Sequence, residues 1–400
     1  MKKTIVALAV VATCGVGGYF INDFMVDKVA QEVVNNVERL AHDASDSYVD
    51  IQVVESEIDG HNVAQKFAVY FIDGTKRHSQ PIYVSHNAKI ALFGSKVEGR
   101  LTLPKDKGLS AEFIQEVTSF NENIHYTFTP YNKAIDLKSS LNVGVISDGS
   151  RRQLKFGEVN FDLAGTLEDN KSKFTVDGIE FTERKESINL GTVAVETIVS
   201  PTLQSSTISL DKGQFIARQG GVNISDIQLK TEAVIEEDTS LNYDWSVGSF
   251  DLDSPDITLL SSKFGMQGTL AGISTATLIE LGSALESNKT SNAEKLFKDI
   301  LGNGLEFSSI NLYLNDSSVT GHIELNKADY STLRSYEVQR LLERSVSSEL
   351  DIVLTPQMIE KLKVPSRSLE KLWTVDENQN YTTKFKLALG KATINGVNMN

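Results

Sequence analysis

From about residue 48 to residue 270, apolar and polar residues alternate along much of the chain. Ile124, Tyr126 and Phe128, for example, are separated by single polar residues. Successive side chains of a β-strand point to opposite faces, so this period of two predicts strands with one apolar and one polar face. Such strands are typical of an antiparallel sheet, because strands of a parallel sheet are buried on both faces.

Glycine residues mark the expected turns between these strands, because hairpin turns need residues that tolerate a positive φ. Four pairs have this composition: Asp73-Gly74, Asp148-Gly149, Asp177-Gly178 and Gly220-Gly221. A glycine followed by alternation also recurs at four places, where the chain is expected to enter a hairpin: Gly178, Gly248, Gly304 and Gly396. The spacing of these copies is irregular, so the pattern does not predict a solenoid.

Apolar residues spaced three and four apart predict a few helices. We expect them at these places: a short one opening at Leu109-Ser110, then Thr277 to Leu285, Ser291 to Leu301, Ala328 to Val346, and one from Thr355-Pro356 onward. Each has one apolar side, and the simplest arrangement is that the helices cover one face of the sheet.

The first 21 residues predict a membrane anchor. Lys2-Lys3 precede an apolar run of 17 residues from Ile5 to Ile21. As a helix this run reaches roughly 25 Å, close to the hydrocarbon thickness of a bilayer. The leading lysines favour a cytoplasmic N-terminus, with the rest of the chain translocated across the membrane. The residues expected to form the membrane anchor are Ile5, Val6, Leu8, Val10, Val11, Val16, Tyr19, Phe20 and Ile21.

Two other fates of this segment are open. It has the length of a signal peptide, and Gly15-Val16-Gly17 offers small residues for cleavage. Alternatively, Cys14 follows Val11-Ala12-Thr13 as a lipidated cysteine would, although Thr13 is a poor residue for that position.

Residues 22–45 are expected to form a helical stalk after the anchor. Val26, Val29, Val33 and Val37 recur at helical spacing and place one apolar stripe on it. The stripe has two candidate uses. It packs on the protein's own domain, or it pairs with the stalk of a second copy through Val29, Val33 and Val37, giving a homodimer.

Composition narrows the function. Cys14 is the only cysteine, so the exported part has no disulfide and no thiolate metal site. A net charge of -14 argues against nucleic acid as a partner. No histidines lie at metal-ligand spacing, and His78 and His86 are expected on exposed turns and strand faces. We therefore expect no metal, no cofactor and no enzyme, although a hydrolase built from dispersed carboxylates leaves no local motif.

The C-terminal third carries a resemblance to a known family. Arg344-Ser345-Val346-Ser347-Ser348-Glu349-Leu350-Asp351-Ile352-Val353-Leu354-Thr355-Pro356, followed by Met358, and the ending Gly390-Lys391-Ala392-Thr393-Ile394-Asn395-Gly396 are similar to the YdgA-type family of bacterial envelope proteins of unknown function. The lysine-led N-terminal anchor also resembles that family. The resemblance implies a periplasmic protein held in the inner membrane, and it brings no catalytic residue with it.

The expected fold is mainly β (α+β): a long antiparallel, twisted or curved sheet with a few covering helices and one transmembrane helix. A β-rich region at 46–270 continues into a helix-covered β region at 271–400 of the same extended fold. Any apolar sheet surface left open would suggest a binding or scaffold role, with a lipid or an envelope protein as ligand. The alternative is a structural or assembly protein that self-associates through its stalk and sheet edges.

Overall fold

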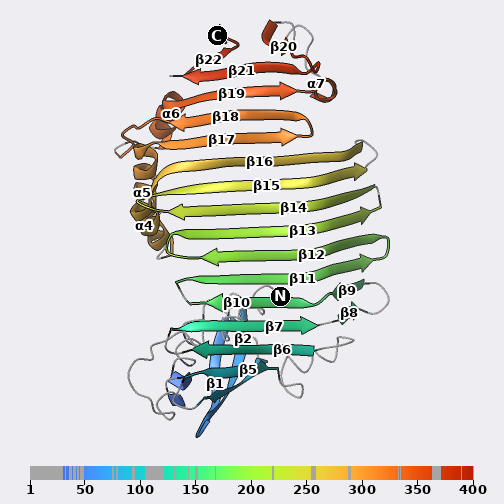
Figure 1. Ribbon diagram of the computed structural model, residues 1–400, viewed down its shortest axis with the longest axis vertical. Helices are drawn as coiled ribbons and strands as arrows, with labels where there is room; N and C mark the ends of the chain where they lie inside the picture. Colours follow the sequence, from blue (N-terminus) through green and yellow to red (C-terminus); the bar gives the residue numbers. More distant parts are fainter. Residues whose placement is uncertain are drawn as a thin grey trace. The chain divides into compact units, whose positions relative to one another are not determined.

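The structure is a computed structural model, shown in Figure 1. It describes residues 49–73, 76–77, 80–91, 95–103, 121–129, 132–142, 144–148, 152–166, 168–218, 220–253, 258–286, 290–331, 333, 335–362, 371–388 and 390–399, with residues 30, 31, 33–35, 38, 42 and 45. Contacts divide the chain into an N-terminal unit (residues 1–200 and 213–219) and a C-terminal unit (residues 201–212 and 220–400). The predicted boundary between the β-rich region and the helix-covered β region, at residue 271, therefore lies inside the C-terminal unit.

The N-terminal unit is built from antiparallel strands. They pair in the order β1-β2-β4-β5-β6-β7-β10-β11-β12, with β3 on β2, β9 on β11 and β8 on β9. Their bounds are β1 (Val49–Asp59), β2 (Asn62–Asp73), β3 (Lys76–Arg77), β4 (Ile82–Ile90), β5 (Val97–Thr102), β6 (Asn121–Thr129), β7 (Ala134–Asn142), β8 (Gly144–Asp148), β9 (Arg152–Phe156), β10 (Val159–Gly165), β11 (Asn170–Glu183) and β12 (Glu186–Val199). Strand β13 (Leu203–Ala217) is divided between the two units.

A closed hydrophobic core lies on one face of strands β1 to β7. Phe67 is 0% exposed and Tyr126 is 1% exposed. Ala30, Val33 and Val34, in the stalk segment, belong to the same buried cluster. The stalk residues therefore form part of the layer that covers this face of the sheet.

The C-terminal unit is a second antiparallel series. Its strands pair in the order β14-β15-β16-β17-β18-β19-β21-β22-β23, with β20 on β21. Their bounds are β14 (Gly220–Ile235), β15 (Asp238–Asp253), β16 (Thr258–Ser274), β17 (Leu305–Leu314), β18 (Ser317–Leu325), β19 (Val346–Leu354), β20 (Thr374–Val375), β21 (Tyr381–Ala388), β22 (Lys391–Ile394) and β23 (Val397–Asn398). The prediction of a mainly β, antiparallel protein with few helices is confirmed.

Four helices are described in this unit: α4 (Thr275–Glu286), α5 (Thr290–Asn303), α6 (Ser335–Ser345) and α7 (Pro356–Leu362). The first two and the last lie where the sequence predicts them. The third is shorter than expected, because Asp329 accepts hydrogen bonds from the backbone N–H and hydroxyl of Ser331. Such a local turn competes with helix formation before residue 335. The short helix expected at Leu109-Ser110 lies outside the described residues.

The expectation that the helices cover one face of the sheet holds only at one end of the strands, where α5 and α6 pack with Leu305, Leu325 and Val346. Figure 1 shows these helices at one end of the strands of the C-terminal unit. Helices α4 and α5 pack on each other through Ala284, Ala293 and Leu296. This packing buries only part of their apolar residues, since Ile279 remains 66% exposed and Phe297 54%. Because these helices lie at one end of the strands, they leave the middle of the sheet uncovered.

Two predicted turns are also wrong, because Gly178 and Gly248 lie inside strands β11 and β15. Gly178 has a φ of +101° and faces the break between β9 and β10. Its carbonyl accepts a hydrogen bond from the N–H of Gly157, and β12 pairs along the other side. Pairing on both sides outweighs the local turn preference of Asp177-Gly178. The turns at Gly304 and Gly396 are confirmed.

Among the described residues, none of the helices has the length and apolar character needed to cross a membrane. The anchor predicted at residues 1–21 lies outside the described part of the chain, as do Val29 and Val37 of the stalk stripe.

Candidate functional site

A row of apolar side chains crosses six strands of the C-terminal unit. Direct cross-strand pairs link its members from β14 to β19: Leu229, Trp245, Met266, Leu312, Val319 and Ile352. Residues directly opposite each other in antiparallel strands share a face of the sheet. The row therefore runs across one face, at right angles to the strands.

Three further rows accompany it on the same face. Their members alternate with the first row along each strand, at even spacing apart from the bulge in β17. The name apolar face is used below for these residues: Ile227, Leu229, Ala233, Leu241, Tyr243, Trp245, Val247, Phe264, Met266, Leu270, Phe307, Ile310, Leu312, Leu314, Val319, Ile323, Leu350 and Ile352. Not one of them is Asp, Glu, Lys, Arg or His.

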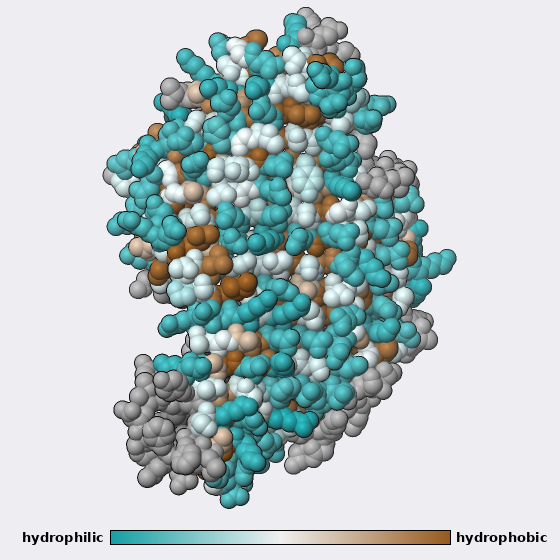
Figure 2. Space-filling model, viewed as in Figure 1, coloured by the Kyte–Doolittle hydropathy of each residue, from teal (hydrophilic) through white to brown (hydrophobic). Residues whose placement is uncertain are grey.

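Large side chains of the apolar face remain open to solvent. Trp245 is 41% exposed, Phe264 46%, Leu312 38%, Leu314 39% and Ile323 36%. Figure 2 shows one side of the molecule, on which hydrophobic residues reach the surface between hydrophilic ones. Contiguous exposed apolar surface of this kind is rare on proteins that act alone and marks contact sites.

Three aromatic residues form the most ordered part of the apolar face. The Tyr243 ring stacks on Phe307 with centroids 5.3 Å apart, and it meets Trp245 edge-on at 6.1 Å. Gly268 permits this, since a Cβ there would lie 2.0 Å from the Tyr243 hydroxyl oxygen. The Tyr243 ring thus lies across β16 and fills the space above the glycine. Burial raises the pKa of Tyr243 above its ordinary value.

A bulge in β17 keeps the apolar residues of that strand on one side. Phe307 pairs with Leu270 and Leu312 pairs with Met266, so β17 holds one residue more than β16 in this stretch. The extra residue is accommodated at Ser309, which has a φ of +53°. A bulge of this type changes the phase of the alternation. Phe307 and Leu312 therefore share a face although their numbers differ by five.

The opposite face of the same strands is polar. A matching row there runs from β14 to β21 through direct pairs: Lys230, Asp244, Gln267, Asn311, Thr320, Asp351 and Lys384. The amide of Gln267 donates to Asp244 at 3.1 Å, and the amide of Asn311 donates to Gln267 at 3.4 Å. These strands thus place their charged groups on the polar side.

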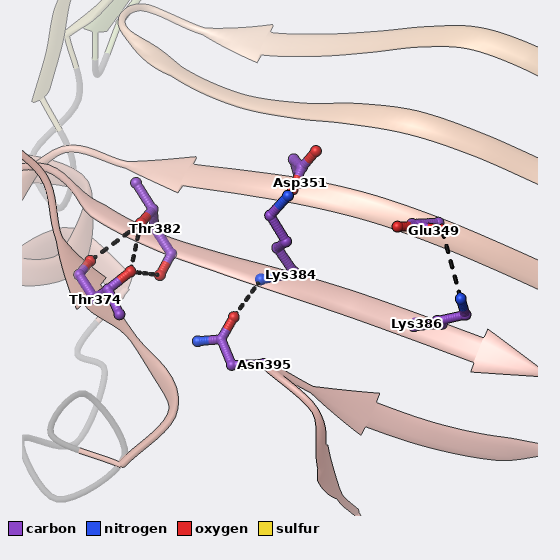
Figure 3. A network of polar contacts seen from close by, with 7 residues as sticks. All are labelled: Glu349, Asp351, Thr374, Thr382, Lys384, Lys386 and Asn395. Carbon is purple, nitrogen blue, oxygen red and sulfur yellow. Dashed lines mark hydrogen bonds and ion pairs between the residues drawn. The ribbon is translucent and has the colours of Figure 1, made fainter.

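Figure 3 shows the end of this polar face on β19 and β21. Lys384 reaches Asp351 at 3.3 Å, and Lys386 reaches Glu349 at 3.7 Å. The side-chain oxygen of Asn395 accepts a hydrogen bond from the backbone N–H of Lys384. The ion pairs are exposed, so each contributes at most about 1 kcal/mol to stability. Their charged groups favour exposure of this face of the sheet to solvent.

A different polar cluster is buried in the core of the N-terminal unit. Nε2 of His86 lies 2.7 Å from the hydroxyl of Tyr126, and Nδ1 lies 3.1 Å from Oε1 of Gln65. Because an amide oxygen only accepts, Nδ1 carries the hydrogen and the Tyr126 hydroxyl donates to Nε2. All three side chains are at most 3% exposed. The cluster thus joins β2, β4 and β6 inside the core.

Burial lowers the pKa of His86 to about 4 and raises the pKa of Tyr126. His86 is therefore neutral at physiological pH. The expectation that His86 lies on an exposed strand face is wrong. The signal was present in the sequence, since His86 continues the apolar phase of Val84, Ala88 and Ile90 along β4.

A hollow of about 700 Å³ lies beside the β17 bulge and is lined partly by polar residues. Glu306 and Glu324 face each other there as a direct cross-strand pair, with His322 and Thr320 nearby in the lining. In the part of the chain that the structure describes, no group of three or more His, Cys, Asp or Glu residues is placed to hold a metal ion.

Only one residue of the stalk stripe can be placed. Val33 is 1% exposed in the core of the N-terminal unit, so its side chain packs on its own domain and not on a second stalk. For Val33 the alternative of packing on the protein's own domain applies, and no self-association is proposed through this stripe.

The sequence did not predict the apolar face as a set of residues, because its members become neighbours only through strand pairing.

Comparisons with known proteins identify no relative of this chain. No family model, no curated protein and no solved structure matches it.

Proposed function

We propose that this chain is a binding or scaffold protein of the bacterial envelope, of the YdgA type. In this proposal residues 1–21 hold it in the inner membrane, and the remainder acts in the periplasm. The apolar face of the C-terminal unit is the surface on which it takes its partner. The observation that carries the proposal is an uncharged surface across six strands whose large side chains remain about 40% exposed.

The energetics favour a partner on this face. Full burial of a large apolar side chain stabilises by about 1.5–3 kcal/mol. A side chain left about 40% exposed retains roughly 1 kcal/mol of that for a later contact. Five such residues, supported by the Tyr243–Phe307 stack, supply several kcal/mol toward binding.

The chemistry of the face restricts what it can hold. It offers no charge, and the indole N–H of Trp245 is already directed at the hydroxyl of Thr231, at 3.4 Å. A partner therefore gains by bringing hydrocarbon surface, such as a lipid chain or the apolar side of an envelope protein. The proposal assigns no catalytic step, since the one histidine with a strongly lowered pKa in the described residues, His86, is buried in the core.

Photo-crosslinking in cells tests this proposal with a matched control. A benzophenone amino acid at Leu312 is expected to capture a lipid or a protein, because Leu312 lies on the apolar face. The same group at Asn311 is expected to capture neither, since Asn311 lies on the polar face of the same strand. Equal capture at both positions, or none at Leu312, would contradict the proposal.

A second measurement identifies lipid directly. The full chain is purified in mild detergent, and its lipids are extracted and quantified by mass spectrometry. Leu312→Glu is expected to lose lipid that co-purifies with the unaltered chain, whereas Asn311→Glu is expected to retain it. This arm applies when the partner is a lipid, and the crosslinking arm covers a protein partner.

A further inference from the structure

We infer that the apolar face is covered by the apolar face of a second copy of this chain, sheet against sheet. This inference rests on the proposed function, because it names the partner of the same surface. It uses a surface different from the stalk stripe, whose Val33 is buried in its own unit.

The distribution of charge permits such a pair. Two copies with a net charge of -14 repel each other, and contact is unfavourable wherever their charged groups meet. The apolar face has no charged residue, and the polar row of Lys230, Asp244, Asp351 and Lys384 lies on the other side of the strands. In a face-to-face pair these rows point outward from the two sheets. They are therefore separated by more than the roughly 10 Å between stacked sheets. That distance is about one Debye length at physiological salt, so the repulsion is screened.

The size of the surface approaches what a stable dimer needs. Six strands spaced about 4.8 Å apart span roughly 24 Å. On strands β14, β15 and β16 the apolar face extends over seven residues, which corresponds to about 24 Å along the strand. The product is about 580 Å² for each copy, before side-chain relief is counted. Standard stable interfaces bury about 800 Å² for each partner.

The geometry of the face also suits a second sheet. Packed sheets interdigitate side chains from two inner faces, each with alternate residues pointing inward. Two strand positions on the face lack a large side chain, namely Gly321 and Ala233, while Trp245 and Phe264 are its most exposed members. A two-fold axis places this patch opposite itself, so that one interface satisfies both copies.

The test measures the mass of the full chain in mild detergent by sedimentation equilibrium. We expect two copies for the unaltered chain, and two copies for Asn311→Glu on the polar face. Leu312→Glu is expected to raise the dissociation constant at least about 100-fold, because it puts an unpaired charge into a desolvated contact. A single copy for the unaltered chain, or an undiminished dimer of Leu312→Glu, would overturn the inference. Circular dichroism checks that both variants fold.

A second measurement does not depend on destabilising the face. In a Cys14→Ser background, single cysteines replace Leu229, Leu312 and Ile352 in turn, and Lys230, Asn311 and Asp351 serve as controls on the polar face. A bismaleimide is expected to link two copies from at least one of the first three positions and from none of the controls. Failure at all three, or equal linking from the controls, overturns the inference.

The outcomes separate this inference from the proposed function. A single copy that carries lipid or crosslinks an envelope protein at Leu312 overturns the second-copy inference and leaves the binding function standing. A single copy with neither lipid nor crosslink at Leu312 overturns both.

Discussion

The strands of the two units have the same alternation of apolar and polar residues, but their apolar faces differ in how far they are buried. In the N-terminal unit, Phe67 and Tyr126 are at most 1% exposed, and stalk residues such as Val33 lie against the strands. In the C-terminal unit, Trp245 and Phe264 project from equally regular strands and remain more than 40% exposed. Alternation is thus satisfied in both, but only one has a second layer among the described residues.

The difference teaches that a one-sided strand pattern specifies a face and not its cover. Burial of a face requires another layer, which the chain supplies from a distant segment or receives from a partner. In the C-terminal unit the helices cover the sheet only at one end of the strands, for example around Leu301, Leu325 and Tyr330. The sheet therefore keeps apolar surface that contributes its full burial free energy only when a partner binds.

The largest expected effect comes from removing one phenylalanine in each unit. Phe67→Ala should lower the free energy of unfolding of the N-terminal unit by about 3–5 kcal/mol, because it leaves a cavity in a closed core. Phe264→Ala should cost below about 2 kcal/mol, since almost half of that side chain is already in water. Hydrogen exchange in urea reports each unit separately. Equal costs would mean that the apolar face is covered within the protein.

The next effect is a pH dependence confined to the N-terminal unit. The pKa of folded His86 is about 4, below the value of 6.5 for an exposed histidine, so folding favours its neutral form. The contribution of neutral, buried His86 to the free energy of unfolding is fully present above about pH 6.5. It is lost as the pH falls toward 4, because the histidine of the unfolded chain binds a proton at higher pH than the folded one. The shift corresponds to a loss of roughly 3 kcal/mol.

The His86 contribution is measured as the difference between the unaltered chain and His86→Asn in urea unfolding across this pH range. His322→Asn, at an exposed position of β18, is the control for the substitution itself. A profile that is the same with and without His86 would show that this histidine does not titrate in the core.

A pair of glycine substitutions compares how the two units tolerate crowding. A Cβ at Gly99 would lie 2.1 Å from the ring of Tyr126, which is enclosed by the core, so Gly99→Ala should cost about 1–3 kcal/mol. A Cβ at Gly268 would lie 2.0 Å from the hydroxyl oxygen of Tyr243, which is buried, although the residue as a whole is partly exposed on the apolar face. There the ring can swing outward, and Gly268→Ala should cost less than half as much. Urea midpoints decide the comparison, and a larger cost at Gly268 would contradict it.

The smallest effect is expected on the polar face. Lys384→Ala removes an ion pair with Asp351 in which both side chains are more than half exposed. Its loss should change the free energy of unfolding by less than about 0.5 kcal/mol. A double-mutant cycle with Asp351→Ala measures the pair, and a coupling above about 1 kcal/mol would show that this face is shielded from water.

Local pattern predicted the elements that depend on nearest neighbours in the chain. The alternation of Ile124, Tyr126 and Phe128 gives a strand whose apolar members are buried, and helices α4 and α5 lie where their apolar spacing predicts. These features follow from backbone geometry that repeats every two or 3.6 residues.

Features that depend on strand pairing were not predictable in this way. Gly178 has the composition of a turn, and only its pairing with strands on both sides keeps it inside β11. His86 is polar by composition, and its burial follows from hydrogen bonds to Gln65 and Tyr126, 21 and 40 residues away. The apolar face is also of this kind, because its register across six strands is set by loop lengths and bulges.

The bulge at Ser309 bears on which changes of chain length this sheet can accept. Deletion of Ser309 would restore strict alternation in β17 and leave Ile310, Leu312 and Leu314 on the side of Phe307, so both faces of the strand keep their residues. Strand β18 pairs with β19 in unbroken register from Ser318 to Leu325. Loss of one residue there would turn the remaining side chains over, with the effect of several simultaneous substitutions. Insertions and deletions of single residues in related chains are therefore expected at the bulge and not in its neighbour.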